Sequence, residues 1–416
     1  MASPGIRPGL ARLARLLRLL GSPERSFRAV HVAGTNGKGS TAAGIESVLR
    51  CSGYKTALYT SPHLVSFSER LLFSGTPAPL DDWKEACSRL STVIEKDKEL
   101  RNDRPTYFEL ATAAAIILTA KASPEVAVFE TGMGGRLDAT NILPDILLSV
   151  IVPIGMDHME YLGNSLAKIA SEKFAIMRNG RPAIFFGNPE LNAEFLERAE
   201  TVGAHPHIFT NECSITESSC SLSGTSFTLE CGGKAASYCT PLIGTFQKDN
   251  AALAVAASRL LASELPHITP ESIQKGISST VWGGRMEVVS SDPLIIIDGG
   301  HNSHAAVRLA ESIKTLLADQ ELNIVIAMMK DKDVLQTLAL FRGLKAKFYC
   351  TEVPGNERSM KAQEMLKEAK EAGLVTEGSF CEPLEALHAA TANKKPTLCC
   401  GSLFLAGCLK ERKNEF

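Results

Sequence analysis

Residues 31–40 read His31-Val32-Ala33-Gly34-Thr35-Asn36-Gly37-Lys38-Gly39-Ser40, and a helix-like segment follows them. Glycines in such a loop let successive backbone N–H groups reach phosphate oxygens, because no Cβ is in the way. Lys38 supplies a positive charge, and Ser40 can hold Mg²⁺ beside the helix N-terminus. The stretch predicts a loop that binds ATP, although Gly39 separates lysine from hydroxyl, which stand side by side in the common motif. A tight turn is the alternative.

The size and charge of the chain limit how many domains it has and what kinds of partner it binds. Its 416 residues exceed what one hydrophobic core usually organises, which predicts two domains. The net charge is −2 with both signs interspersed, so we expect no nucleic-acid partner. Arginines interrupt the leucine-rich segment 10–20, which predicts an amphipathic helix and no membrane span. A targeting presequence is the alternative for this segment, because Arg7, Arg12, Arg15 and Arg18 precede any acidic residue. We expect a cytoplasmic protein.

Eleven cysteines are scattered along the chain, without metal-type spacing or the density of a disulfide scaffold. This usage predicts a reducing compartment. Four of them cluster, at Cys213, Cys220, Cys231 and Cys239. A metal site is one interpretation of the cluster, but no short C-x₂-C pair occurs, which favours free thiols within strands.

Apolar runs of strand length alternate with segments of helical period, which predicts an α/β fold with parallel sheets. The first domain, placed at residues 1–289, is expected to be a P-loop ATPase-type unit. Its expected strands are 29–33, 56–60, 126–130, 147–153 and 183–186, and its expected helices are 40–51, 80–98, 106–121, 165–178 and 251–261. Residues 205–240 are rich in Ser, Thr, Cys and Gly and predict a small antiparallel sheet.

A polar stretch at 290–293 predicts the domain boundary, after which the alternation of strand and helix restarts. The second domain, residues 290–416, is expected to be a smaller, doubly wound, Rossmann-like unit. Its expected strands are 294–298, 324–328, 347–351 and 397–400, and its expected helices lie near 303–317, 362–372 and 384–390.

Ligands of open α/β sheets bind at the carboxyl ends of strands, so charged residues there are candidate site residues. Glu130 closes an apolar strand, and its carboxylate can meet the Mg²⁺ held by Ser40; a loop cap is the alternative. His158 follows another strand, but imidazole is an unusual ligand for a hard cation, so a structural histidine is an equal alternative. Lys173 lies on an apolar helix side, where it needs a charged partner or covalent neutralisation unless it snorkels to the surface.

Further polar residues are spread along the chain, and each is a weak signal alone. Gln247 and Asn250 carry amides that can bind adenine, and Arg285 can neutralise a transferring phosphoryl group. Asp298 follows a strand and can accept from ribose hydroxyls, or it is only a turn residue.

The motifs together resemble the folylpolyglutamate synthase/dihydrofolate synthase family, within the Mur ligase superfamily of ATP-dependent amide-forming enzymes. Nine motifs occur in the family's order: 33–40, 59–64, 106–109, 134–141, 157–158, 172–173, 247–250, 284–285 and 298–302.

The resemblance implies a set of roles. Ser40, Glu130 and His158 are expected to bind Mg²⁺, and Lys173 is expected to be carried as a carbamate. Lys38, Lys173 and His301 are the expected catalytic residues. The expected ATP contacts are Gly34, Thr35, Asn36, Gly37, Lys38, Gly39, Ser40, Gln247, Asn250, Arg285 and Asp298, with the active site between the domains. The expected pterin-side residues are Thr106, Tyr107, Phe108, Glu109, Arg136, Leu137 and Asp138.

The function expected from the resemblance is addition of glutamate to dihydropteroate and to reduced folates, through an acyl phosphate. A monovalent cation such as K⁺ is left open as a further cofactor, and we expect a monomer that binds small molecules only. The alternatives are a monofunctional folylpolyglutamate synthase, a cell-wall Mur ligase, and a P-loop module without ligase activity. The last is disfavoured because the chain has no N-K-x-D base-reading motif.

Overall fold

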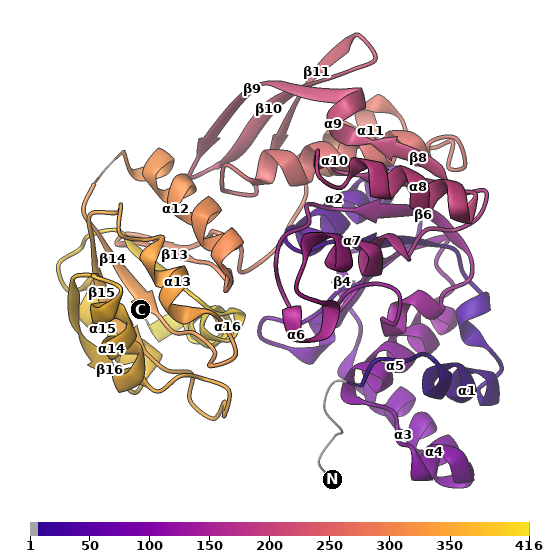
Figure 1. Cartoon of the computed structure of the whole chain (residues 1–416), viewed down its shortest axis with the longest axis horizontal. Coiled ribbons are helices and arrows are strands. Elements are labelled where there is room, and N and C mark those ends of the chain that lie inside the picture. The colour runs from indigo at the N-terminus through magenta and orange to yellow at the C-terminus, as the bar shows by residue number, and fades with distance from the viewer. Residues whose placement is uncertain (1–6, 319, 416) are drawn as a thin grey trace. The chain divides into compact units, whose positions relative to one another are not determined.

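The computed structural model describes residues 7–318 and 320–415, which fold into two compact units (Figure 1). The first unit comprises the chain up to Glu217 together with Thr228–Tyr238 and Asp249–Thr280. The second comprises Ser218–Phe227, Cys239–Lys248 and the chain from Val281 onward. Each unit has a sheet flanked by helices, so the predicted α/β class is confirmed.

The sheet of the first unit has the strand order β4-β3-β2-β5-β1-β6-β7-β8. All neighbours from β2 to β8 run parallel, whereas β3 and β4 add an antiparallel edge that the sequence analysis did not predict. The strands are β1 Ala29–Ala33, β2 Thr56–Tyr59, β3 Leu71–Phe73, β4 Thr76–Pro77, β5 Val126–Glu130, β6 Ile146–Ile151, β7 Pro182–Phe185 and β8 His205–Ile208.

Strand β1 lies between β5 and β6 and is buried along its whole length. Val32 pairs with Glu130 of β5, and Ala33 pairs with Ile151 of β6. The carboxyl ends of these three strands are therefore neighbours. This register brings the loops that follow them to one edge of the sheet, where α/β proteins bind ligands.

The predicted helices before residue 281 are present within two residues of their expected bounds, except that α7 ends four residues earlier and α10 begins four residues earlier than predicted; α4, α6, α8, α9 and α11 were not predicted. They are α1 Ala11–Leu19, α2 Lys38–Cys51, α3 Leu80–Lys96, α4 Lys98–Asn102, α5 Tyr107–Ala122, α6 Met159–Leu162, α7 Leu166–Phe174, α8 Asn192–Val202, α9 Phe209–Glu212, α10 Gln247–Leu261 and α11 Pro270–Ser278.

Helix α1 is amphipathic, as predicted for segment 10–20. Its residues Leu13, Leu16 and Leu17 are fully buried in the core that α3 and α5 also line. Its arginines meet acidic side chains, with Arg12 on Glu109 and Arg15 on Asp97. The arginine-rich segment that suggested a presequence is thus an integral part of the first unit.

A small sheet with the order β11-β10-β9 confirms the predicted antiparallel sheet in part (Figure 1). Its strands are β9 Cys213–Ser221, β10 Gly224–Cys231 and β11 Lys234–Thr240, joined by two-residue turns as antiparallel neighbours are. The prediction is wrong for residues 205–208, because β8 instead pairs in parallel with β7.

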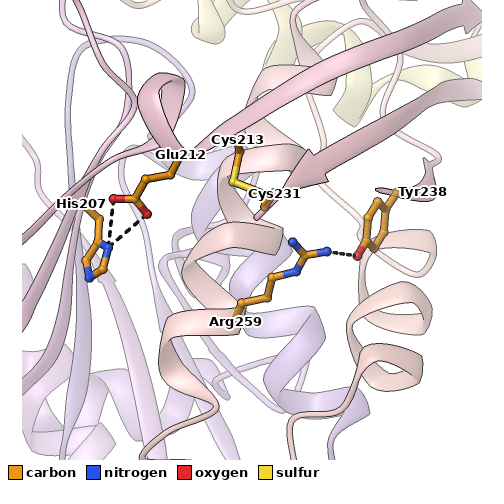
Figure 2. The surroundings of a disulfide bond; sticks show 6 residues. All are labelled: His207, Glu212, Cys213, Cys231, Tyr238 and Arg259. Atoms are coloured by element: carbon orange, nitrogen blue, oxygen red, sulfur yellow. Dashed lines mark hydrogen bonds and ion pairs between the residues drawn. A yellow bond between two sulfur atoms is a disulfide. The ribbon is translucent and has the colours of Figure 1, made fainter. Parts of the chain in front are cut away.

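Cys213 and Cys231 form a disulfide, so the expectation of free thiols is wrong for this pair (Figure 2). The two residues open β9 and close β10, which makes them cross-strand neighbours although 18 positions separate them. Beside them, Arg259 of α10 donates to the Tyr238 hydroxyl of β11, and both residues belong to the first unit. Cys220 and Cys239 are free.

The sheet of the second unit has the order β12-β13-β17-β14-β15-β16, all parallel except β12. The strands are β12 Glu287–Ser291, β13 Leu294–Ile297, β14 Leu322–Ile326, β15 Ala346–Thr351, β16 Thr376–Phe380 and β17 Thr397–Cys400. The helices are α12 Ser303–Leu317, α13 Val334–Ala339, α14 Ala362–Glu371, α15 Pro383–Thr391 and α16 Leu403–Glu411. Strands β12 and β16 and helices α13 and α16 were not predicted, and β14 begins two residues before its predicted start.

The polar stretch 290–293 is not an extended linker. Ser290 and Ser291 lie on β12, and Asp292-Pro293 makes the turn into β13. Over the described part of the chain, every helix is too short or too polar to cross a membrane.

Candidate active site

The loop between β1 and α2 has the geometry of a phosphate-binding loop. Gly37 precedes α2 with φ +98°, a left-handed conformation that glycine adopts without strain. A Cβ on Gly37 would stand 2.3 Å from Oδ1 of Asn250, so the loop and α10 approach each other closely here. The free N–H groups at the start of the 14-residue helix α2 then favour an anion such as phosphate.

Thr35 fastens this loop to the segment after β6. Its backbone N–H donates to the carbonyl of Pro153 at 3.0 Å. Its hydroxyl donates to the Gly155 carbonyl at 3.1 Å and accepts from the Gly155 N–H at 3.0 Å. The loop therefore has a fixed position relative to segment 153–158, which carries His158.

Two lysines meet at the start of the loop. Nζ of Lys38 donates to the carbonyls of Gly34 and Thr35, at 3.3 and 3.1 Å. Nζ of Lys173, on α7, donates to the same Gly34 carbonyl at 2.6 Å, and its side chain is buried. Burial, followed by the positive charge of Lys38, lowers the pKa of Lys173 to about 7. Near neutral pH, much of Lys173 is therefore a neutral amine.

Oxygen donors that suit Mg²⁺ lie at the end of β5 and in the first turn of α2. Glu130 is buried, and its Oε2 accepts from the backbone N–H of Ser61 at 3.2 Å. Ser40 is buried in the first turn of α2. The next residue after Glu130, Thr131, has a buried hydroxyl with no hydrogen-bond partner among the described residues. Carboxylate and hydroxyl oxygens are the donors Mg²⁺ prefers, so this set fits the ion.

His158 differs from these oxygen donors. It stands in the left-handed region with φ +51°, its side chain is exposed, and its Nε2 lies 3.9 Å from Asp157. Among residues 7–318 and 320–415, no group of three or more His, Cys, Asp or Glu could hold a metal. The role of His158 as an Mg²⁺ ligand stays a prediction.

Of the two segments predicted to line the pterin side, 106–109 packs on the loop that follows β5, and 136–138 adjoins α7 next to Lys173. The Phe108 ring packs on Gly132, to within 2.4 Å of where a Cβ would stand. A Cβ on Gly135 would stand 2.5 Å from the carbonyl of Glu172 on α7. Arg136 donates its backbone N–H to the same carbonyl, at 2.8 Å, and its guanidinium pairs with the Glu172 carboxylate.

Two carboxylates in these segments organise their own backbone. Glu109 closes a capping box at the start of α5 by accepting from the Thr106 backbone N–H at 2.8 Å; the same oxygen accepts from Thr106 Oγ1 at 2.7 Å, and the other accepts from Nε of Arg12. Asp138 accepts from the N–H groups of Met133 and Thr140 at 2.8 and 2.9 Å. Burial is the largest influence on Asp138 and raises its pKa.

In the second unit, Arg285, Asp298 and His301 lie close together. Asp298 accepts from the N–H groups of Met286 and Gly300, and Nδ1 of His301 lies 3.1 Å from the Gly299 carbonyl. A Cβ on Gly299 would stand 2.6 Å from the guanidinium of Arg285. Burial raises the pKa of Asp298 against the opposing charge of Arg285. Gln247 is buried at the start of α10.

Three residues with roles at this site were missed by the sequence analysis. Arg12 was counted only with the N-terminal arginines, yet it supports Glu109. His31 and Thr140 hydrogen-bond to each other at 2.8 Å, and Thr140 also bonds Asp138. His31 lies in the stretch 31–40 and Thr140 in the motif 134–141, but a hydrogen bond across 109 positions leaves no signal in a single sequence.

Two family models match the chain. Residues 32–258 match the Mur ligase middle domain, and residues 284–403 match the Mur ligase glutamate ligase domain. The first match covers more than half of the chain.

Named relatives and solved structures agree with these matches. The chain is 37% identical to the dihydrofolate synthase/folylpolyglutamate synthase of Bacillus subtilis over 79% of this chain and 77% of that protein. It is 31% identical to the folylpolyglutamate synthase of Lacticaseibacillus casei over 96% and 93%. Folylpolyglutamate synthase of Mycobacterium tuberculosis complexed with ADP and AMPPCP superimposes with a TM-score of 0.89 at 28% identity, covering 98% and 96% of the two chains.

Escherichia coli FolC in complex with DHPP and ADP superimposes with a TM-score of 0.87 at 32% identity, covering 100% of this chain and 95% of that one. The chain belongs to the folylpolyglutamate synthase/dihydrofolate synthase family of Mur ligases and is an ATP-dependent ligase.

Proposed function

We propose that this enzyme joins L-glutamate to dihydropteroate and to reduced folyl(poly)glutamates, through an acyl phosphate formed with ATP. One observation carries the proposal: the buried Lys173 donates to the phosphate-binding loop at Gly34, and the loop that follows β5 packs against α7 beside Lys173. The names of the Bacillus subtilis and Escherichia coli relatives, which give both synthase activities, support it.

The chemistry requires activation of a carboxylate, because a free carboxylate is a poor electrophile. The N–H groups of residues 34–40 and the Lys38 ammonium bind the ATP phosphates and offset the charge that develops during phosphoryl transfer. Transfer of the γ-phosphoryl group to the pteroate carboxylate gives an acyl phosphate and ADP. The glutamate amine then attacks the acyl carbon, an amide bond forms, and phosphate leaves with the electron pair of the broken C–O bond.

Ser40, Glu130 and His158 are proposed to hold Mg²⁺. The ion, when bound, neutralises charge on the transferring phosphoryl group. K⁺ as a further cofactor stays open.

Lys173 is proposed to be carboxylated. A neutral amine reacts with CO₂ to give a carbamate and one proton, and a pKa of about 7 supplies that amine under physiological conditions. The carbamate places a negative charge beside the Lys38 ammonium, which attracts it, whereas a protonated Lys173 would be repelled.

The remaining site residues keep their predicted roles. Thr106, Tyr107, Phe108, Glu109, Arg136, Leu137 and Asp138 are proposed for the pterin side, where the exposed Tyr107 ring offers a stacking surface. Asn250, Gln247, Arg285 and Asp298 are proposed for ATP, and His301 for catalysis. We also propose a division into functional domains at residues 1–289 and 290–416, and a cytoplasmic monomer without nucleic-acid partners.

A monofunctional folylpolyglutamate synthase is the second candidate. The relative from Lacticaseibacillus casei, which covers nearly the whole chain, carries that single name.

Oxygen-18 labelling tests the acyl phosphate. With both oxygens of the pteroate carboxylate labelled, the proposed route transfers one label to inorganic phosphate for each amide formed. Release of unlabelled phosphate together with amide formation would exclude the acyl phosphate route. A Lys38→Met enzyme is the control for phosphate released by contaminating ATPases.

A further inference from the structure

His31 is a buried polar residue that the proposed reaction does not use. It lies on the central strand β1, between β5 and β6, and its side chain is fully buried. Its Nε2 is 2.8 Å from Oγ1 of Thr140, whereas its Nδ1 has no hydrogen-bond partner among the described residues. The direction of this one hydrogen bond therefore decides what His31 does.

The direction follows from the bonds around Thr140. Oγ1 of Thr140 carries one proton and lies 2.5 Å from Oδ1 of Asp138. Both oxygens of Asp138 already accept backbone N–H bonds, from Thr140 and from Met133, so the carboxylate is the acceptor. Thr140 donates its proton to Asp138 and must accept from His31, which places the imidazole proton on Nε2.

The imidazole supplies this donor without becoming charged. Burial, followed by the charge of Arg178, lowers the pKa of His31 to about 3. Its single proton is held on Nε2 by the one hydrogen bond that the ring makes within the described parts of the chain.

Asp138 in turn holds a loop. By accepting from Met133 and from Thr140, it ties together the two ends of the segment 133–140. Between those ends, Arg136 contacts Glu172, the neighbour of Lys173. Displacement of Asp138 would therefore move Arg136 and Leu137 as well.

We propose that His31 is a positioning residue for the pteroate substrate: through Thr140 it holds Asp138 and the loop 133–140 in their binding geometry. The substrate named here rests on the proposed function.

Thr140→Val and His31→Leu test the hydrogen bonds from His31 through Thr140 to Asp138. Each variant removes one hydrogen-bond donor while keeping the side-chain volume nearly constant. The matched control is Thr119→Val, which deletes an equally buried hydroxyl on α5 that has no hydrogen-bond partner in the described part of the chain. Thr140→Ser and His31→Gln restore the donors, since a glutamine amide can stand where Nε2 does. His31→Asn is the control for burying an amide in the wrong place.

The measurements are KM for dihydropteroate, KM for ATP, and hydrogen exchange of the peptide 132–141. We expect Thr140→Val and His31→Leu to raise KM for dihydropteroate about tenfold or more, with KM for ATP changed less than about twofold. We also expect faster exchange in the peptide. Thr140→Ser and His31→Gln should recover most of the loss, and Thr119→Val should behave as wild type.

Three results would overturn the proposal: an unchanged KM for dihydropteroate, equal rises in both KM values, or unchanged exchange in the peptide. If the wild-type enzyme uses neither dihydropteroate nor folates, the proposed function fails separately. The exchange rates then still decide whether His31 and Thr140 hold the loop, and unchanged rates would overturn the inference.

Discussion

Nζ of Lys173 lies 2.6 Å from the carbonyl oxygen of Gly34, which joins α7 to the first residue of the phosphate-binding loop. The bond explains how a lysine on an apolar helix side is accommodated, although one carbonyl dipole compensates a buried ammonium poorly. It also places the amine beside Lys38, so the site favours any chemistry that removes the positive charge of Lys173.

Titration of Lys173 should make the stability of the enzyme depend on pH. The pKa is about 7 in the folded chain and 10.5 for an ordinary lysine, so between these values the unfolded chain binds more protons. The free energy of unfolding should therefore rise with pH, relative to Lys173→Met, by about 2 kcal/mol between pH 7 and pH 9. Urea unfolding in CO₂-free buffer measures it. If the free energies of unfolding of wild type and Lys173→Met differ by the same amount at every pH, the assigned burial of Lys173 is contradicted.

Gly37 should tolerate no side chain. Gly37→Ala places a Cβ 2.3 Å from Asn250 and should abolish binding of a fluorescent ATP analogue. Gly53→Ala is the matched control, because Gly53 has a similar φ of +88° and nothing within 4 Å of its Cβ position. Backbone strain is then equal, at about 1 kcal/mol, and only the clash differs. Equal losses of binding in the two variants would contradict the assigned clash between the Gly37 Cβ position and Asn250.

Arg12 should stabilise the first unit through Glu109. Arg12→Met leaves the buried carboxylate with only its capping-box bonds, and we expect a loss of about 2 kcal/mol in the free energy of unfolding. Arg18→Met, on the exposed side of the same helix, should change it by less than about 0.5 kcal/mol. Similar losses of stability in Arg12→Met and Arg18→Met would contradict a specific contribution of the Arg12–Glu109 ion pair.

The disulfide should stabilise the chain and lower the number of thiols that react with a thiol reagent. Denatured protein that has not been reduced should expose nine thiols to a thiol reagent, and reduced protein eleven. Closing a loop with a sequence separation of 18 contributes about 3 kcal/mol in the chain-entropy model. Dithiothreitol should therefore lower the melting temperature of wild type and of Cys239→Ser, but not that of Cys213→Ser/Cys231→Ser. Eleven thiols without reduction would contradict the bond.

Much of the fold was predictable because local patterns determined it. The apolar run 126–130 became β5 without a shift, and the glycines and lysine of 34–40 sit between strand and helix as expected. The same local logic found Lys173, because a lysine with apolar neighbours one helical turn away has to be explained.

What could not be predicted depends on partners distant in sequence. Residues 205–208 have polar, weakly alternating side chains, and only pairing with β7 makes them a parallel strand. Cys213 and Cys231 face each other because of the register of β9 and β10, which composition does not reveal. Glu109 and Asp138 were assigned to substrate, yet their bonds to their own backbone appear only once the chain is folded.

Phosphate release shows whether the enzyme ligates glutamate to both pteroate and folate. Purified enzyme is supplied with Mg·ATP and glutamate, and dihydropteroate is compared with tetrahydrofolate while product masses are recorded. We expect release with both acceptors, each yielding a product heavier by one glutamate. Release with tetrahydrofolate alone would establish the monofunctional enzyme, and release with neither would contradict the account.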